Sequence, residues 1–158
     1  METEDLPKEV LQFKNVMRLL MFVFGVAGIT YLFCGDQFIL FGNWLGADVF
    51  KLPLPPMPMP IERFWLTHTF SLMMILTALC YQIQKDVLSN MKLTSFVLIG
   101  LLSSTILFIS YFFSEKQFNY ILGAAFCDGP LFLIVFLFYR RALMSLIPPC
   151  LKNQEKTS

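Results

Sequence analysis

Four apolar segments, each long enough to cross a lipid bilayer as a helix, dominate this sequence. They cover residues 16–34, 64–84, 93–113 and 120–139, and Arg18 and Asp128 are the only Asp, Glu, Lys or Arg residues within them. A helix of about 20 residues spans the hydrocarbon core because each residue adds about 1.5 Å. The sequence therefore predicts an all-α integral membrane protein with four transmembrane helices.

The composition excludes the common alternatives to a membrane protein. Hydrophobic residues make up 56% of the chain and charged residues 15%, and 18 of the residues are phenylalanine. A soluble domain of 158 residues could not bury that much apolar surface, so the lipid bilayer is the expected partner. The formal net charge of +1 gives no electrostatic reason to expect a nucleic-acid partner.

The lysines and arginines predict which side each connection faces. The positive-inside rule places the connections richer in these residues in the cytoplasm. Three cations fall in the connections after the first and third helices, and nine fall at the opposite ends of the helices: Lys8, Lys14, Arg18, Lys85, Lys92, Arg140, Arg141, Lys152 and Lys156. We therefore expect a cytoplasmic N-terminal tail of residues 1–15, a transmembrane domain of residues 16–141 and a cytoplasmic C-terminal tail of residues 142–158. The expected location is the plasma membrane as a multi-pass protein, with a bacterial inner membrane preferred because no sorting signal is visible.

The lengths of the connections predict an up-and-down four-helix bundle. Residues 85–92 and 114–119 are short links, which make the second, third and fourth helices antiparallel neighbours. The first link is long and lies outside. Residues 38–50 mix apolar side chains with glycines, which is typical of an interfacial or re-entrant segment. Residues 53–60 contain five prolines, which exclude helix and favour an extended polyproline II strap.

Asp128 is the residue that most invites a functional interpretation. It lies about nine residues, or roughly 13 Å, into the fourth helix from the outer side. An ionised carboxylate near the bilayer centre costs about 2.5–3.5 kcal/mol, so Asp128 must be protonated, paired or exposed to water. Pro130 follows closely and removes a helical hydrogen bond to Phe126. Either a binding or proton-handling role, or a register-fixing hydrogen bond to a neighbouring helix, fits this pattern.

Other polar residues reach a similar depth on neighbouring helices. His68 and Ser71 share one face of the second helix, one turn or more inside its outer end. With Asp128 they would bracket a polar layer beneath the strap, although a single histidine near an interface is commonly only a hydrogen-bonding residue. The candidate set for this layer or ligand site is Asp128, His68, Ser71, Ser103 and Ser104, with Glu62 and Arg63 at its rim.

No nucleotide-binding, metalloprotease or nucleophile-elbow motif occurs in the sequence. The four cysteines have no CxxC spacing, so we expect no cofactor and no metal site. The leading hypothesis is a non-enzymatic membrane protein that is an accessory subunit of another membrane protein or binds a small lipophilic molecule.

Two other functions remain open from the sequence. A membrane enzyme or a proton-coupled carrier could act through Asp128 and His68. Copper handling through Met57, Met59 and His68 is a further alternative, because Cu(I) accepts thioether and imidazole ligands. Nine methionines in an apolar chain weaken that signal, since methionine is chiefly a packing residue.

Overall fold

Each apolar segment forms a helix in the structure, which is a computed structural model that describes residues 6–59 and 64–146. Apart from residues 51–59 and the short links, these residues are helical, and none of them forms a strand. Four helical stretches are long and apolar enough to span a membrane: Lys8–Val49, Leu66–Lys85, Val87–Glu115 and Phe118–Leu146. The expectation of an all-helical protein with four candidate membrane helices is confirmed to that extent.

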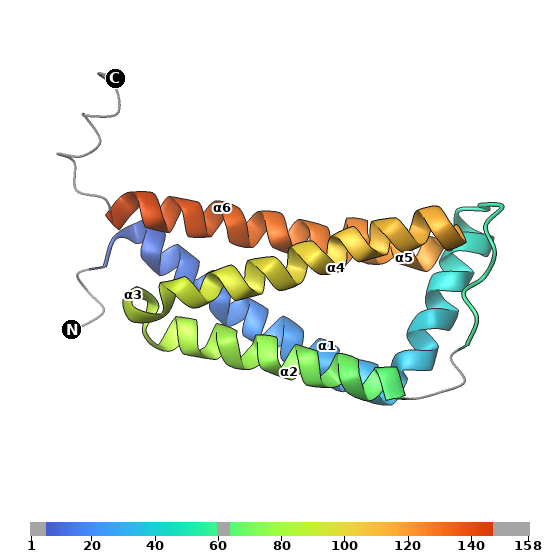
Figure 1. The fold of residues 1–158 in the computed structure, drawn as a ribbon, viewed down its shortest axis with the longest axis horizontal. Helices are drawn as coiled ribbons and strands as arrows, with labels where there is room; N and C mark the ends of the chain where they lie inside the picture. Colours follow the sequence, from blue (N-terminus) through green and yellow to red (C-terminus); the bar gives the residue numbers. More distant parts are fainter. Residues whose placement is uncertain (1–5, 60–63, 147–158) are drawn as a thin grey trace, which may run out of the picture.

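The first helix, α1, is longer than expected and bends where we expected it to end. It covers Lys8–Trp44, with a non-helical backbone at Cys34 (φ −126°, ψ 22°), and a wider helical turn, η2, continues over Leu45–Val49. Figure 1 shows the segment after this bend turning across one end of the molecule. Residues 35–49 are called the cap segment below. Most of the expected interfacial segment is thus a helix continuous with the first span.

The next helices follow the expected boundaries closely. Helix α2 covers Phe64–Lys85 and is followed by the short α3, Val87–Asn90, and the 3-10 turn η3, Met91–Leu93. The Asp86 carboxylate caps α3 by accepting the backbone N–H of Ser89 at 3.2 Å. Helix α4 then runs over Thr94–Glu115.

The last helical stretch begins immediately after a sharp turn. Lys116 ends α4 in the left-handed conformation (φ 54°, ψ 32°), and its N–H bonds the carbonyl of Phe112. The stretch then consists of α5 (Phe118–Leu122), the wide turn η4 (Gly123–Asp128) and α6 (Gly129–Leu146). It therefore extends past the expected boundary at residue 139.

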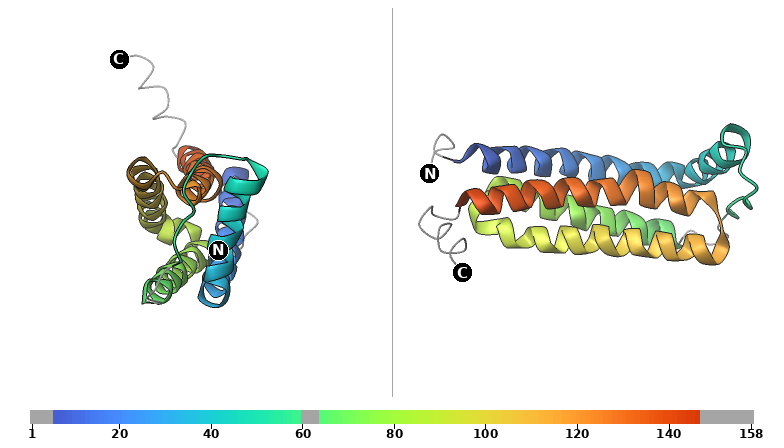
Figure 2. Two further views of the ribbon diagram at one scale, coloured as in Figure 1. Left: turned by 90° about the vertical axis from the view of Figure 1, so that its right-hand side faces the viewer. Right: turned by 90° about the horizontal axis from the view of Figure 1, so that it is seen from above.

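The four long helices run beside one another (Figures 1 and 2). Helix α1 packs along α2 and also contacts α6, and α4 packs mainly against η4, α5 and α6. Helices α1 and α4 each contact both α2 and α6, which lie at opposite corners of the bundle in the end-on view of Figure 2. The start of α1, the turn α3 and the end of α6 lie at one end, here called the α3 end, and the cap segment lies at the opposite end.

The buried core is concentrated near the α3 end. Phe13, Met17 and Leu20 of α1 are almost completely buried, and they join a cluster with Ile83 and Val97 from the next two helices. Toward the cap end the pair α1 and α2 diverges from α4 and α6 (Figure 1). The candidate site lies in this less densely packed half.

Candidate functional site

Asp128 ends the wide turn η4, at the place where the proline predicted a weakened backbone. The N–H of Gly129 bonds the carbonyl of Ala124, five residues earlier, instead of the residue four positions back. Pro130 has no N–H, so it cannot donate the regular helical hydrogen bond to the carbonyl of Phe126. The wider turn uses hydrogen bonds between residues five apart and accommodates the proline. Wide turns of this kind are frequent at functional sites, although they also accommodate prolines in scaffolds.

One neighbouring helix supplies the partner of Asp128. The Ser104 hydroxyl on α4 donates a hydrogen bond to Oδ2 of Asp128, and both side chains are half-buried. Tyr31 of α1 lies within electrostatic range of Asp128 and Cys127. The carboxyl group therefore lies where α4 packs against η4.

The other hydroxyls of the expected polar layer bond to their own helices. Ser71 donates to the carbonyl of Thr67 at 2.9 Å, and Ser103 donates to the carbonyl of Gly100 at 3.0 Å. Such back-bonds satisfy a hydroxyl locally without joining two helices. Of the serines we assigned to the layer, Ser104 is the one that the structure joins to Asp128.

His68 does not lie beside Asp128. It is exposed on α2, while Asp128 belongs to the last helical stretch, which lies at the opposite corner of the bundle from α2 (Figure 2). Among the described residues nothing forms a hydrogen bond with its imidazole. Glu62 and Arg63, the expected rim of the site, fall outside the described residues. The structure thus joins part of the candidate set and separates His68 from it.

A polar cluster at the cap end was not foreseen. The Asn43 side chain forms two hydrogen bonds with the backbone of Met57: Nδ2 donates to the carbonyl at 2.9 Å, and Oδ1 accepts the N–H at 2.8 Å. Nδ2 of Asn119, at the start of α5, lies 3.2 Å from Oδ1 of Asn43 and 3.5 Å from the Met57 sulfur. We call these three residues the asparagine cluster. It joins the cap segment, the proline strap and the last helical stretch.

Close backbone packing accompanies the asparagine cluster. A Cβ atom at Gly42 would collide with Oδ1 of Asn119, and one at Gly46 would lie 3.1 Å from the Phe118 side chain. The ring of Phe118 also contacts Phe50, with centroids 5.4 Å apart. In the sequence these glycines contributed to the expectation of an interfacial or re-entrant segment, whereas in the fold they allow the cap segment to approach α5.

The methionines of the copper hypothesis have different surroundings. The sulfur of Met57 faces Asn119 within the asparagine cluster, whereas Met59 is 43% exposed. In the part of the chain that the structure describes, no group of three or more His, Cys, Asp or Glu side chains could hold a metal ion. Methionine thioethers are a separate class of Cu(I) ligand, so the copper alternative stays a prediction.

A shallow groove opens at the bend of α1. Thr30, Cys34, Gln37, Phe38 and Phe41 line it, and its volume is about 280 Å³. Tyr31 stacks on Phe38 beside it, with ring centroids 5.2 Å apart. The groove could accept an apolar ligand or part of a lipid acyl chain, because its accessible lining is apolar.

Comparison with protein-family models, with curated proteins and with solved structures finds no match to this chain.

Proposed function

We propose that this protein is a non-enzymatic, multi-pass membrane protein that acts as an accessory subunit of a larger membrane assembly. In this proposal the four helices cross the plasma membrane, preferably a bacterial inner membrane, in an up-and-down bundle. Both tails and the α3 turn face the cytoplasm, and the cap segment and the proline strap lie outside, as the distribution of lysine and arginine favours.

The observation that carries this proposal is that Asp128 pairs with Ser104, while His68 is exposed on α2. An enzyme or a proton carrier that used both residues would need them close to a shared substrate or water path. A carboxyl group that bonds a neighbouring helix instead fixes the register of two helices, for about 0.6–2 kcal/mol per interhelical hydrogen bond. The geometry therefore favours a structural role for Asp128.

The outward surface supports a role in an assembly. Large apolar side chains are exposed along all four long helices, for example Phe22, Ile75, Phe96 and Leu133. In a membrane such faces contact lipid or the helices of another protein. Binding of a small lipophilic molecule is the second candidate, and the apolar groove at the bend of α1 is the observation that favours it.

Replacing Asp128 with Asn separates the structural role from proton handling. Asparagine keeps the shape and can still accept the Ser104 hydrogen bond, but it cannot titrate. We expect D128N to accumulate in the membrane and to melt in detergent like the wild type, whereas Asp128→Leu melts at a lower temperature. Purified wild-type protein in liposomes loaded with a pH-sensitive dye should pass no more protons than empty liposomes. A proton flux that D128N abolishes would establish the carrier alternative and refute the proposal.

The sidedness can be tested by cysteine labelling in whole cells. Met59 is a better position for an introduced cysteine than Met57, because Met57 is held within the asparagine cluster. Two variants are needed, one with M59C as its single cysteine and one with the native Cys150 as its single cysteine. A membrane-impermeant maleimide should label the M59C variant but not the Cys150 variant. The reverse pattern would overturn the proposed orientation.

A further inference from the structure

A second groove, of about 390 Å³, lies between α1 and α2 near the α3 end of the molecule. Three cationic side chains, Lys14, Arg18 and Lys85, line this groove together with Gln84. No carboxylate of the described residues lines it. This groove is separate from Asp128 and from the cap segment, and the proposed function makes no use of it.

Helix geometry brings these charges together. Lys14 and Arg18 are four residues apart and lie on one face of α1, and Tyr81 and Lys85 have the same relation on α2. The two faces meet because α1 and α2 pack along each other. The sequence contained this signal, since both pairs stand at helix ends that the predicted topology places on the same side.

Gln84 orients the arginine. Nε of Arg18 donates to Oε1 of Gln84 at 3.4 Å, and Nε2 of Gln84 contacts the sulfur of Met21 at 3.0 Å. Among the described residues this is the one hydrogen bond that the Arg18 guanidinium makes, so its two terminal nitrogens keep their donors for a ligand. A planar guanidinium with free donors is well suited to the oxygens of a phosphate group.

The groove changes from charged to apolar along the helices. Phe22 lies two turns beyond Lys14 toward the membrane interior, about 12 Å along the axis at 1.5 Å per residue. Tyr81 lies one turn deeper than Lys85 on α2. Phe22 and Tyr81 are 60% and 49% exposed, so their surfaces are open to a ligand. A phospholipid has the same order of groups, with its phosphate at the interface and its acyl chains below.

We propose that this groove binds an anionic phospholipid, with the phosphate at Lys14, Arg18 and Lys85 and one acyl chain along Phe22 and Tyr81. Basic pockets between membrane helices are known binding places for anionic head groups. Three converging cations without a carboxylate repel one another, and a phosphate relieves that repulsion. The inference requires only that the α3 end lies at a membrane interface, so it holds whichever face of the membrane that is.

Lipid retention by the purified full-length protein tests this proposal. Native mass spectrometry in mild detergent would compare phosphatidylglycerol with phosphatidylcholine of identical acyl chains. We expect the wild type to retain phosphatidylglycerol about tenfold more strongly, and the double variant R18Q/K85Q to lose this preference. R18K, which keeps the charge, should retain most of it.

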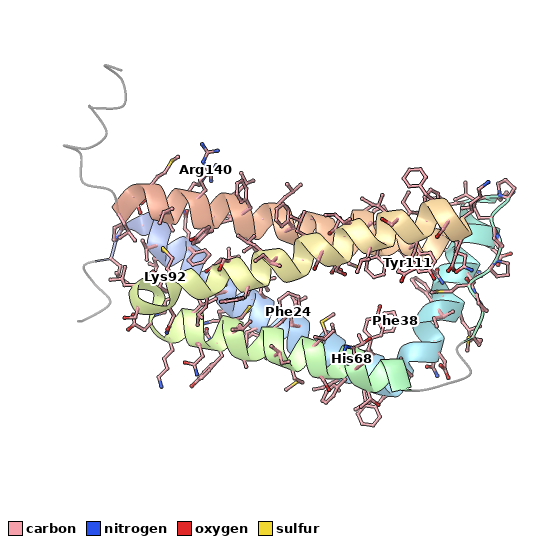
Figure 3. The ribbon with its side chains drawn as sticks, in the orientation of Figure 1. Phe24, Phe38, His68, Lys92, Tyr111 and Arg140 are labelled. Atoms are coloured by element: carbon pink, nitrogen blue, oxygen red, sulfur yellow. The ribbon has the colours of Figure 1, made fainter. Side chains whose placement is uncertain are left out.

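A matched control removes two charges at the same end of the molecule. Arg140 and Arg141 are exposed on α6, and Figure 3 shows Arg140 projecting away from α2. R140Q/R141Q should keep the lipid preference. Equal loss in both double variants would show general surface attraction and overturn the proposal, as would a preference that survives R18Q/K85Q. Thermal melting of each variant identifies any that fail to fold, in which case R18Q alone replaces the double variant.

Two further measurements distinguish a lipid from a free phosphate. Inorganic phosphate should not displace phosphatidylglycerol, because it lacks the acyl chain that contacts Phe22 and Tyr81. F22A should weaken retention of phosphatidylglycerol severalfold while leaving the three cations in place. Displacement by inorganic phosphate together with an unchanged F22A variant would mean that the groove binds the phosphate group alone, and the lipid proposal would be wrong.

Discussion

Removing the Asn43 side chain should release the proline strap without unfolding the helices. Asn43→Ala deletes both hydrogen bonds to the Met57 backbone, which measure 2.9 and 2.8 Å. Each such bond contributes about 0.5–1.5 kcal/mol net, so the attachment is weakened by about 1–3 kcal/mol. This range corresponds to a population of the released strap that is roughly 5 to 140 times larger.

Hydrogen exchange at the Met57 amide measures this release directly. Prolines occupy four of residues 51–59 and carry no N–H, so few amides compete for the signal. Residue-resolved exchange by mass spectrometry in detergent should show faster exchange at Met57 in Asn43→Ala by that factor. Leu52 is the internal reference, because its N–H bonds the carbonyl of Gly46 and does not depend on Asn43.

Two variants sharpen the test of the strap. Asn43→Asp keeps an oxygen that accepts the Met57 N–H but loses the donor to the Met57 carbonyl, so we expect an intermediate exchange rate. Asn15→Ala, at an exposed position of α1, should change nothing. Unchanged exchange at Met57 in Asn43→Ala would refute the reasoning, and equal acceleration at Leu52 would show that the whole cap segment had opened.

Three further predictions concern the backbone. In a detergent melting assay, Gly129→Ala should destabilise the protein by about 1–3 kcal/mol, because its Cβ would collide with the carbonyl oxygen of Ala124. Gly25→Ala is the control and should be tolerated, because the nearest atom to its Cβ would be 3.8 Å away. Lys116→Gly should raise the melting temperature, since it relieves about 1 kcal/mol of left-handed backbone strain; a lower value would contradict this. Hydrogen bonds from the Ser89 side chain and N–H lower the pKa of Asp86 below 3.8, so the capping contribution is present above that value and disappears as pH falls through the lowered pKa. Asp86→Asn should therefore lose this acid dependence when melting is compared between about pH 5 and about pH 2.

The four long apolar helices could be predicted because their signals are local. Apolar runs bounded by lysine and arginine identified all four, and Cys34, the expected end of the first, is where α1 bends. The cap segment was harder to predict because Gly42 and Gly46 are poor helix formers in isolation. Their role depends on Asn119 and Phe118, more than 70 residues away, and contacts at such separations are not visible in a single sequence.

The candidate site was predictable only in part for the same reason. Depth along a helix follows from counting residues, and it correctly placed Ser104 level with Asp128. Which side of a helix faces which neighbour does not follow from depth, and in an apolar chain the polar face is a weak guide. That is why His68, which we expected beside Asp128, is exposed on α2 while Asp128 bonds Ser104 of α4.

The uneven distribution of buried side chains has a consequence for how the molecule comes apart. Phe13, Met17 and Ile83 belong to a continuous core near the α3 end, whereas Ile39 and Leu66 are buried apart from that core. Local unfolding requires less free energy where fewer apolar contacts are broken. The helices should thus separate first beneath the cap segment and last at α3, which gives the protein a progressive opening from its cap end toward its α3 end.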